Sequence, residues 1–245
     1  MDATTTIFLS FLAGFLPAII WLFYFLWEDR KNPEPGWRIF SCFAYGMLAI
    51  PFAILIQYII KILVLEGGEV YELFFSNYFV TLLSIVAMVA TEEILKYIAA
   101  YKGGISKKSN NEPLDPIIYV ITAAIGFAAL ENTLYVLDPL LASDTYAAVL
   151  TGKTRFIGST LLHIASSGII GLFIAFSYYK KDSIKKTYLF YGIFLSIVLH
   201  TLFNSFIIRE GNFALVGFIT VWVSIIAIII LFEKVKKIIS PNIKI

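Results

Sequence analysis

Long apolar stretches separated by short polar connections dominate the pattern of this chain. Seven stretches reach the roughly 20 apolar residues that a helix needs to cross a bilayer core. They cover approximately residues 6–27, 37–65, 74–101, 117–137, 156–179, 187–208 and 213–232. The second is long enough to be tilted or to continue beyond the bilayer as helix. The pattern predicts an all-α, polytopic transmembrane bundle of about seven spans, with residues 1–245 forming a single transmembrane domain.

Composition supports this fold class and narrows the function. Of the 245 residues, 59% are hydrophobic and the mean hydropathy is +0.84, whereas soluble domains average roughly 45–50% apolar residues. Cys42 is the only cysteine, which excludes an intrachain disulfide and a multi-cysteine metal site. The two histidines are too few for a histidine-rich metal cluster. The basic residues flank the spans without forming a contiguous patch, so no nucleic-acid partner is expected.

The distribution of Lys and Arg predicts the orientation of the bundle. Fourteen of these residues lie in the connections near 28–38, 102–116 and 180–186 and in the C-terminal tail. Three lie in the N-terminus and in the connections near 66–73, 138–155 and 209–212. Because Lys and Arg accumulate in cytoplasmic segments, we expect a multi-pass cell-membrane protein with its N-terminus outside and its C-terminus in the cytoplasm.

Three segments need a closer assignment. The connection 102–116, rich in Gly, Ser, Asn and Pro, is typical of a cytoplasmic linker. The connection 138–155 contains an apolar run that favours a short interfacial helix on the outer face. The first span could be a cleaved signal peptide, but no basic residue precedes it and its apolar run is too long.

Ionisable side chains occur inside the predicted spans, where lipid would otherwise be expected. Such a residue at the bilayer centre costs about 2.5–3.5 kcal/mol on insertion scales, so these positions are candidate functional residues. They are Glu92, Glu93, Glu131, His163 and His200, accompanied by Asn132 and Asn204. Both histidines of the chain therefore lie within spans.

Local spacing indicates how the glutamates are held. Lys96 lies four residues after Glu92 and three after Glu93, so on a helix it can face either carboxylate. The alternative is a juxtamembrane patch from which Lys96 reaches the interface. Adjacent carboxylates differ by about 100° around the helix axis, so the two glutamates cannot have identical roles. Small residues near Gly126 let another helix approach, which places Glu131 against protein, as a functional group or as a buried protonated carboxyl.

The histidines favour a site shared between spans. His163 precedes Ser166 and Ser167 by about one turn, and His200 lies four residues before Asn204 on the same face. A single histidine in a span is often only packed and hydrogen-bonded. Two histidines on consecutive antiparallel helices, beside helices that bear three glutamates, favour a common chemical role.

This set of carboxylates, imidazoles and carboxamides fits peptide hydrolysis. The reaction needs a base to activate water, donors for the oxyanion and an acid for the leaving amine. A metal-assisted alternative would place His163, His200 and Glu131 around a divalent ion. The chain lacks H-E-x-x-H and G-x-S-x-G, and also the Tyr-Asp and Gly-x-Gly-Asp signatures of presenilin-like proteases.

At these residues the chain resembles the PrsW family of intramembrane proteases, in the superfamily of CAAX prenyl endopeptidases and bacteriocin-processing enzymes. The matching elements lie in order on four consecutive spans within 74–208: Glu92-Glu93-x-x-Lys96, Phe127-x-x-x-Glu131-Asn132, His163 and His200-x-x-x-Asn204. The loop Lys31-Asn32-Pro33-Glu34-Pro35 also resembles the family's first cytoplasmic loop. The superfamily's usual E-E-x-x-x-R and F-x-x-x-H motifs differ here at Lys96 and Glu131. This departure matches PrsW and makes a prenylated CAAX substrate unexpected.

The resemblance implies cleavage of a membrane-anchored protein substrate, for example an anti-sigma factor. It assigns the general base to Glu92 and Glu93 and places His163, His200 and Asn204 around the scissile carbonyl. Supporting positions are Lys96, Asn132 and Phe127. We expect a metal-free, glutamic-type site, and zinc is the cofactor of the metal-assisted alternative.

Two other functions fit parts of the pattern. The scaffold subunit of gamma-secretase, of the APH family, is also a seven-span relative with histidines in spans 5 and 6. A proton-coupled transporter would use intramembrane Glu and His as a relay, but no inverted repeat is evident.

The predicted depths of the polar residues differ. Counting about 1.5 Å per residue places Glu92 in the cytoplasmic half of its span and Glu131 and both histidines in the outer half. A separate structural pair on the third span is therefore an alternative to one shared site.

Overall fold

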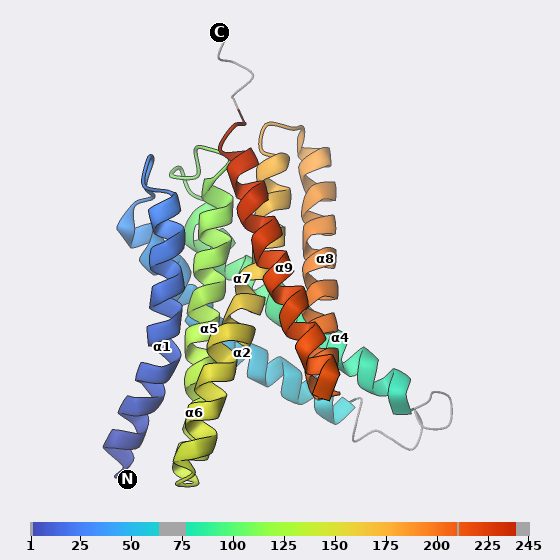
Figure 1. Ribbon diagram of the computed structural model, residues 1–245. Helices are drawn as coiled ribbons and strands as arrows, with labels where there is room; N and C mark the ends of the chain where they lie inside the picture. Colours follow the sequence, from blue (N-terminus) through green and yellow to red (C-terminus); the bar gives the residue numbers. More distant parts are fainter. Residues whose placement is uncertain (1, 64–76, 210, 239–245) are drawn as a thin grey trace.

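The computed structural model describes residues 2–63, 77–209 and 211–238, and all regular structure in this part of the chain is helical (Figure 1). The predicted loop 66–73 and the adjoining ends of the second and third predicted spans lie outside the described residues. The helices are α1 (Ala3–Glu28), α2 (Gly36–Lys61), α4 (Asn77–Ala100), α5 (Asp115–Leu141), α6 (Thr145–Thr154), α7 (Thr160–Phe176), α8 (Asp182–Ile208) and α9 (Gly211–Val235). Two π-helical segments, η2 (Tyr101–Ile105) and η3 (Arg155–Ser159), follow α4 and α6.

The all-helical, multi-pass prediction is confirmed. Among the described residues, 6 helices are long and apolar enough to cross a membrane, with α6, η3 and α7 forming one of 32 residues. The predicted spans correspond to α1, α2, α4, α5, α7, α8 and α9. The segment 102–116 begins as η2, so the linker there is shorter than predicted.

The connection 138–155 does not contain a separate interfacial helix. Instead, α6 continues through η3 into α7 without a break. Within this helix Arg155, a residue expected at the membrane surface, turns inward and pairs with Glu131 on α5. The charge of Arg155, which lies in the predicted connection, is therefore paired inside the protein.

Helix α5 forms the centre of the bundle, and Figure 1 shows it beside α1 with α7 and α9 on its other side. Every residue from Asp115 to Ala129 is buried. Glycines let α2 approach closely: a Cβ on Gly46 would lie 2.0 Å from the carbonyl oxygen of Ala123, and one on Gly126 would lie 2.1 Å from that of Phe43. The predicted close packing around Gly126 is thus confirmed.

Helix α4 and the second half of α2 run obliquely to α1, α5 and α9 (Figure 1). Pro51 lies inside α2, where it removes one backbone hydrogen bond and favours a kink. An inclined helix gains less depth per residue than an upright one, so counting residues misplaced Glu92 relative to the other polar residues. The N-terminus and the C-terminal end of α9 lie at opposite ends of the bundle.

Candidate active site

Glu93 and Lys96 form a buried ion pair on α4 that several helices surround. The Lys96 Nζ lies 2.6 Å from Glu93 Oε1, and both side chains have an exposed fraction of 0%. Four further groups contact this carboxylate: Ser166 at 2.9 Å and Ser167 at 3.2 Å from α7, and Ser196 at 2.8 Å and His200 Nδ1 at 2.6 Å from α8. A carboxylate has about four acceptor positions, so Glu93 is fully occupied as an anchor.

Glu92 differs from its neighbour because it faces a cavity. Its Oε1 accepts a hydrogen bond from Gln57 Nε2 on α2 at 2.8 Å. Its Oε2 is buried and has no hydrogen-bond partner, and lies 3.8 Å from His200 Nε2. The roughly 100° between successive helical side chains therefore gives one anchored glutamate and one that faces open space.

The two histidines have different hydrogen-bonding partners. His200 Nδ1 donates to the Glu93 carboxylate, which leaves the lone pair of Nε2 on the side of Glu92. His163 contacts Lys96 Nζ through Nδ1 at 3.0 Å and Glu131 Oε2 through Nε2 at 2.9 Å. The lysine ammonium can only donate, so Nδ1 accepts and Nε2 carries the proton in this arrangement. The rings lie 5.2 Å apart at 85°.

Arg155, at the start of η3, holds the second ion pair of the site. Its Nη2 donates to Glu131, and its Nε donates to Asn132 Oδ1 at 2.6 Å. Its guanidinium also lies over the ring of Tyr135, 3.9 Å from the centroid. Asn132 in turn donates to Thr160 Oγ1 at 2.9 Å. Arg155 therefore fixes two adjacent polar residues of α5.

Sequence reasoning missed Arg155 because it seemed to lie outside the spans. It is eight residues before His163, which in an unbroken α-helix places it about 80° away around the axis. The π-helical turn adds one residue and brings the two side chains to the same carboxylate, Glu131. Gln57 was also missed, since an uncharged polar residue near the end of α2 gave no signal of its own.

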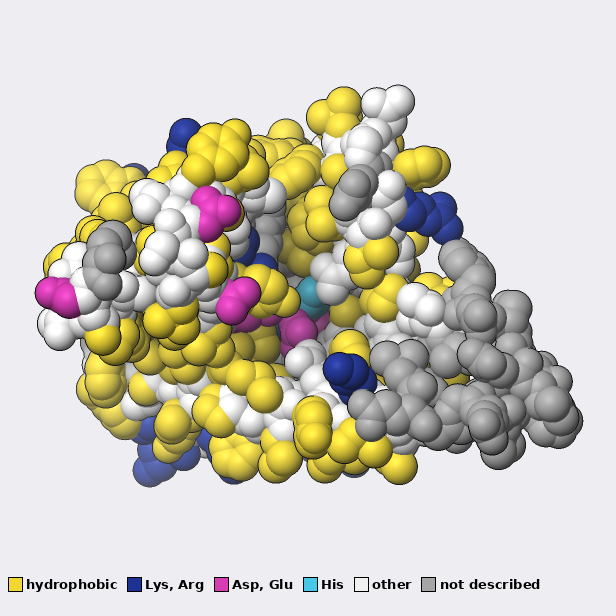
Figure 2. Space-filling view, turned by 90° about the horizontal axis from the view of Figure 1, so that it is seen from below, with side chains coloured by type: hydrophobic (Ala, Val, Ile, Leu, Met, Phe, Trp, Pro, Cys, Tyr) yellow, Lys and Arg dark blue, Asp and Glu magenta, His cyan; other side chains and the backbone are white. Residues whose placement is uncertain are grey.

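The predicted site residues meet at two connected cavities. The first, of 420 Å³, is lined by residues that include Glu92, Glu131, His163, His200 and Asn204. The second, of 350 Å³, shares Gln57, Glu92, Glu131 and Tyr135 with the first. Seen from below, a hollow in the surface shows a histidine and acidic side chains at its floor (Figure 2). One shared site, rather than a separate pair on α4, is therefore the arrangement in the structure.

The supporting residues also lie at this site. The Phe127 ring packs against His163, with 5.4 Å between centroids, and lies 5.4 Å from Lys96 Nζ. Glu34, from the loop after α1, lies elsewhere and accepts a hydrogen bond from the Tyr119 hydroxyl. That loop is therefore not part of the cavity.

Comparison with known proteins identifies the family. A sequence model described as "PrsW family intramembrane metalloprotease" matches residues 34–231, which is most of the chain. The chain belongs to the PrsW family. It is therefore an intramembrane protease and a multi-pass membrane protein, and not the scaffold or transporter considered as alternatives.

Several curated relatives extend this result. The chain is 27% identical to Protease PrsW of Clostridioides difficile (strain 630) over 208 residues, covering 84% of this chain and 82% of the relative. It is 27% identical to Protease PrsW of Geobacillus kaustophilus over 195 residues (78% and 76%). It is 23% identical to Protease PrsW of Bacillus subtilis (strain 168) over 204 residues (82% and 83%). No solved structure matches the chain.

The family description raises the question whether the residues present fit a metal ion. One ligand atom each from Glu92, His163 and His200 lie within 4.8 Å of one another, and all three residues are buried. The partnerless Oε2 of Glu92 and the free lone pair of His200 Nε2 fit this role directly. His163 fits if its proton moves to Nδ1 and Lys96 gives up its contact. Glu131, which the sequence suggested as the carboxylate ligand, is instead held by Arg155 and His163.

Proposed function

We propose that this protease hydrolyses a peptide bond in or beside the transmembrane segment of a membrane-anchored protein, with a divalent metal ion such as zinc held by Glu92, His163 and His200. The observation that carries the proposal is the buried, partnerless Glu92 Oε2, which faces His200 Nε2 at the cavity. A bound divalent ion would supply Lewis-acid polarisation of the scissile carbonyl. This replaces the metal-free site that we favoured from the sequence.

Glu93 acts on the reaction through His200. Its carboxylate accepts the Nδ1 proton of His200 and so fixes the tautomer whose Nε2 lone pair faces the cavity. Lys96 balances the charge of Glu93, and the three serines complete its hydrogen bonding. Removing a donor from this group would let the imidazole turn away.

Glu131 is the carboxylate that we assign to proton transfer. It lines both cavities, and it is not one of the three residues that we propose as metal ligands. Arg155 donates to it and sets its position, also when His163 turns its Nε2 lone pair to a metal ion. Asn204 lines the cavity beside His200 and supplies a carboxamide donor for the oxyanion.

The substrate class follows from the surroundings of the site. Apart from α4, the long helices that line the cavity are long and apolar enough to cross a membrane, and its lining includes apolar residues such as Met88, Val89 and Leu162. A membrane-anchored protein, for example an anti-sigma factor as the family resemblance implies, presents apolar chain at this depth.

The test is a metal and cleavage measurement on purified protein in liposomes. Zinc content would be determined by mass spectrometry for the wild type, Glu92→Gln and His200→Ala, with Glu112→Gln as a control remote from the cavity. We expect both site variants to lose bound zinc and cleavage of a tagged single-span reporter, and the control to keep both. A chelator should abolish cleavage, and zinc should restore it. Unchanged cleavage in metal-free protein would overturn the metal assignment, and unchanged cleavage in both variants would overturn the site.

A further inference from the structure

A groove runs away from the site between α2 and α5. It is the second cavity, of 350 Å³, and it starts at Glu92 and Glu131, which also line the first. Helix α2 contributes Ile50, Ala53, Ile54 and Gln57, and helix α5 contributes Phe127, Leu134, Tyr135 and Asp138. Half of its ten lining residues are apolar, and Asp138 is the one polar residue of the groove that does not also line the first cavity.

The part of α2 that lines the groove follows its close contact with α5. The two helices are in tight contact at Gly46 and Gly126, where an added Cβ would collide with the opposite backbone. Pro51 lies five residues after Gly46 in α2, where a proline lacks a backbone N–H and disfavours a straight helix. From Ile50 onward, side chains of α2 and α5 line a cavity between them.

Asp138 lies seven residues after Glu131 on α5. At about 1.5 Å per residue this is about 10 Å along the helix axis, a length that about three residues of extended chain would span. Asp138 is exposed, and within residues 2–63, 77–209 and 211–238 it forms no ion pair. The groove thus has an unpaired negative charge at a fixed distance from the site.

We infer that the α2–α5 groove holds the substrate segment on one side of the scissile bond in extended form, and that Asp138 binds a lysine or arginine about three residues from that bond. This inference rests on the proposed function. A lipid chain would gain little beside the carboxylates of Glu92 and Glu131, whereas an extended peptide has N–H groups to donate to them. A segment positioned for hydrolysis must also be extended locally, since helical carbonyls are already hydrogen-bonded.

A charge exchange tests the role of Asp138. Tagged single-span reporters in liposomes would carry a lysine at successive positions on each side of the cleavage site that mass spectrometry identifies. For the wild type we expect cleavage to be fastest with the lysine about three residues away on one side. Glutamate at that position should slow cleavage by roughly two- to fivefold, as expected of a partly exposed ion pair. Asp138→Lys should reverse this preference.

A matched pair of substitutions tests occupation of the groove. Ile54 and Leu55 are adjacent on α2, with exposed fractions of 52% and 57%, but Ile54 lines the groove and Leu55 is not among its lining residues. Ile54→Trp should fill the groove and slow cleavage, while Leu55→Trp should leave it unchanged. Thermal unfolding in detergent would show that both variants keep their fold.

The outcomes separate this inference from the proposed function. If the wild type cleaves no reporter of the panel, the proposed function fails. If it cleaves them all regardless of lysine position, and Asp138→Lys and Ile54→Trp behave like the wild type, the inference about the groove fails while the proposed function stands. Equal loss with Ile54→Trp and Leu55→Trp would also overturn the inference.

Discussion

Glu92 and Glu93 are neighbours in the sequence and have opposite surroundings. Glu93 is surrounded by donors from three helices, whereas Glu92 presents a partnerless oxygen to a cavity. The sequence predicted that the two would differ, because successive helical side chains diverge by about 100°. It could not predict which one faces the cavity, since that depends on the serines of α7 and α8.

Arg155 provides the first test at the scale of single residues. Its guanidinium donates to Glu131 and Asn132 at once, and a lysine cannot make both bonds in the same geometry. We expect Arg155→Lys to reduce reporter cleavage by roughly ten- to a hundredfold, because Glu131 would lose its fixed position. Lys153→Arg, two residues earlier and also basic, should cleave like the wild type. Wild-type kinetics in Arg155→Lys would contradict a positioning role.

Asp29, just after α1 and outside the spans, provides a test of pH dependence. Burial raises its pKa from 3.8 to about 7, with further increases from Asp115 and Glu112, and the Glu34 backbone N–H opposes the shift. The folded state therefore holds this proton more tightly than the unfolded state. Its contribution to the free energy of unfolding is complete below about pH 4 and is lost as pH rises through about 7.

We therefore expect the wild type to lose thermal stability between about pH 5 and 7.5 more steeply than Asp29→Asn, which has no proton to lose. Melting temperatures in detergent at several pH values would measure this difference. Parallel curves for the two proteins would show that Asp29 does not hold its proton in the folded state.

At the scale of elements, glycine contacts fix how α2 packs on α5. A Cβ on Gly46 would lie 2.0 Å from a backbone oxygen of α5, which no side-chain movement can relieve. We expect Gly46→Ala to lower the free energy of unfolding by about 1–3 kcal/mol. Gly152→Ala in α6, where the nearest atom is 3.9 Å away, is the control and should gain up to about 1 kcal/mol through helix propensity. Equal stability of the two variants would argue against close α2–α5 packing.

Helix positions were easier to predict from the sequence than helix continuity and slope. Apolar length located α1, α2, α5, α8 and α9 to within a few residues. The joining of α6 to α7 was missed because the stretch 138–155 was assigned as a connection, although one of its polar residues, Arg155, has its partner on another helix. The slope of α4 was missed for a similar reason: it arises from packing between helices, which hydropathy does not report.

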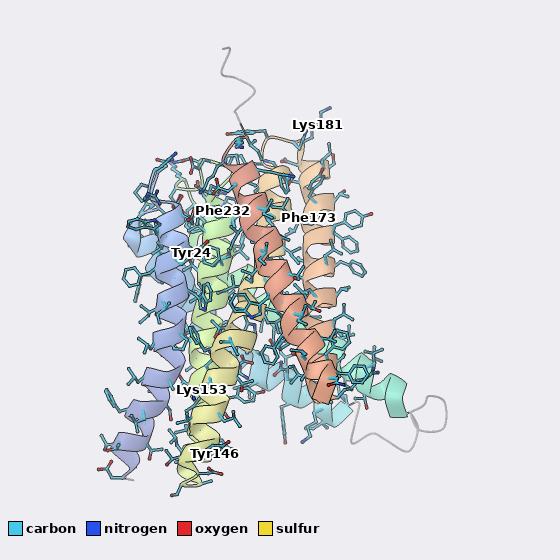
Figure 3. The ribbon with its side chains drawn as sticks, in the orientation of Figure 1. Tyr24, Tyr146, Lys153, Phe173, Lys181 and Phe232 are labelled. Carbon is cyan, nitrogen blue, oxygen red and sulfur yellow. The ribbon has the colours of Figure 1, made fainter. Side chains whose placement is uncertain are left out.

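At the scale of the whole molecule, the orientation in the membrane is still a prediction. Tyr146 and Lys181 lie toward opposite ends of the bundle (Figure 3). In a Cys42→Ala background, we expect a membrane-impermeant maleimide to label Tyr146→Cys on intact cells and to label Lys181→Cys only after permeabilisation. The opposite labelling pattern would place the C-terminus outside.

The sequence predicted the membrane bundle and named most of the polar residues that lie together in the structure, but not how space is distributed among them. Charged residues in spans are unusual enough to identify without a structure. The two cavities, by contrast, lie near features of packing between helices: the glycine contacts of α2 with α5, Pro51 and the inward turn of Arg155. None of these features has a sequence pattern that specifies a cavity.

The burial of Glu93 also has a consequence for how the protein is made. Its hydrogen-bond partners Ser196 and His200 follow it by 103 and 107 residues. During synthesis, α4 is therefore made well before α8, and without α8 the Glu93 carboxylate has only Lys96 and the two serines of α7 as partners. An unfinished chain has a poorly satisfied carboxylate in lipid and no assembled catalytic centre. We therefore expect a chain that ends before α8 to be inactive, because it lacks the histidine that lies between Glu92 and Glu93.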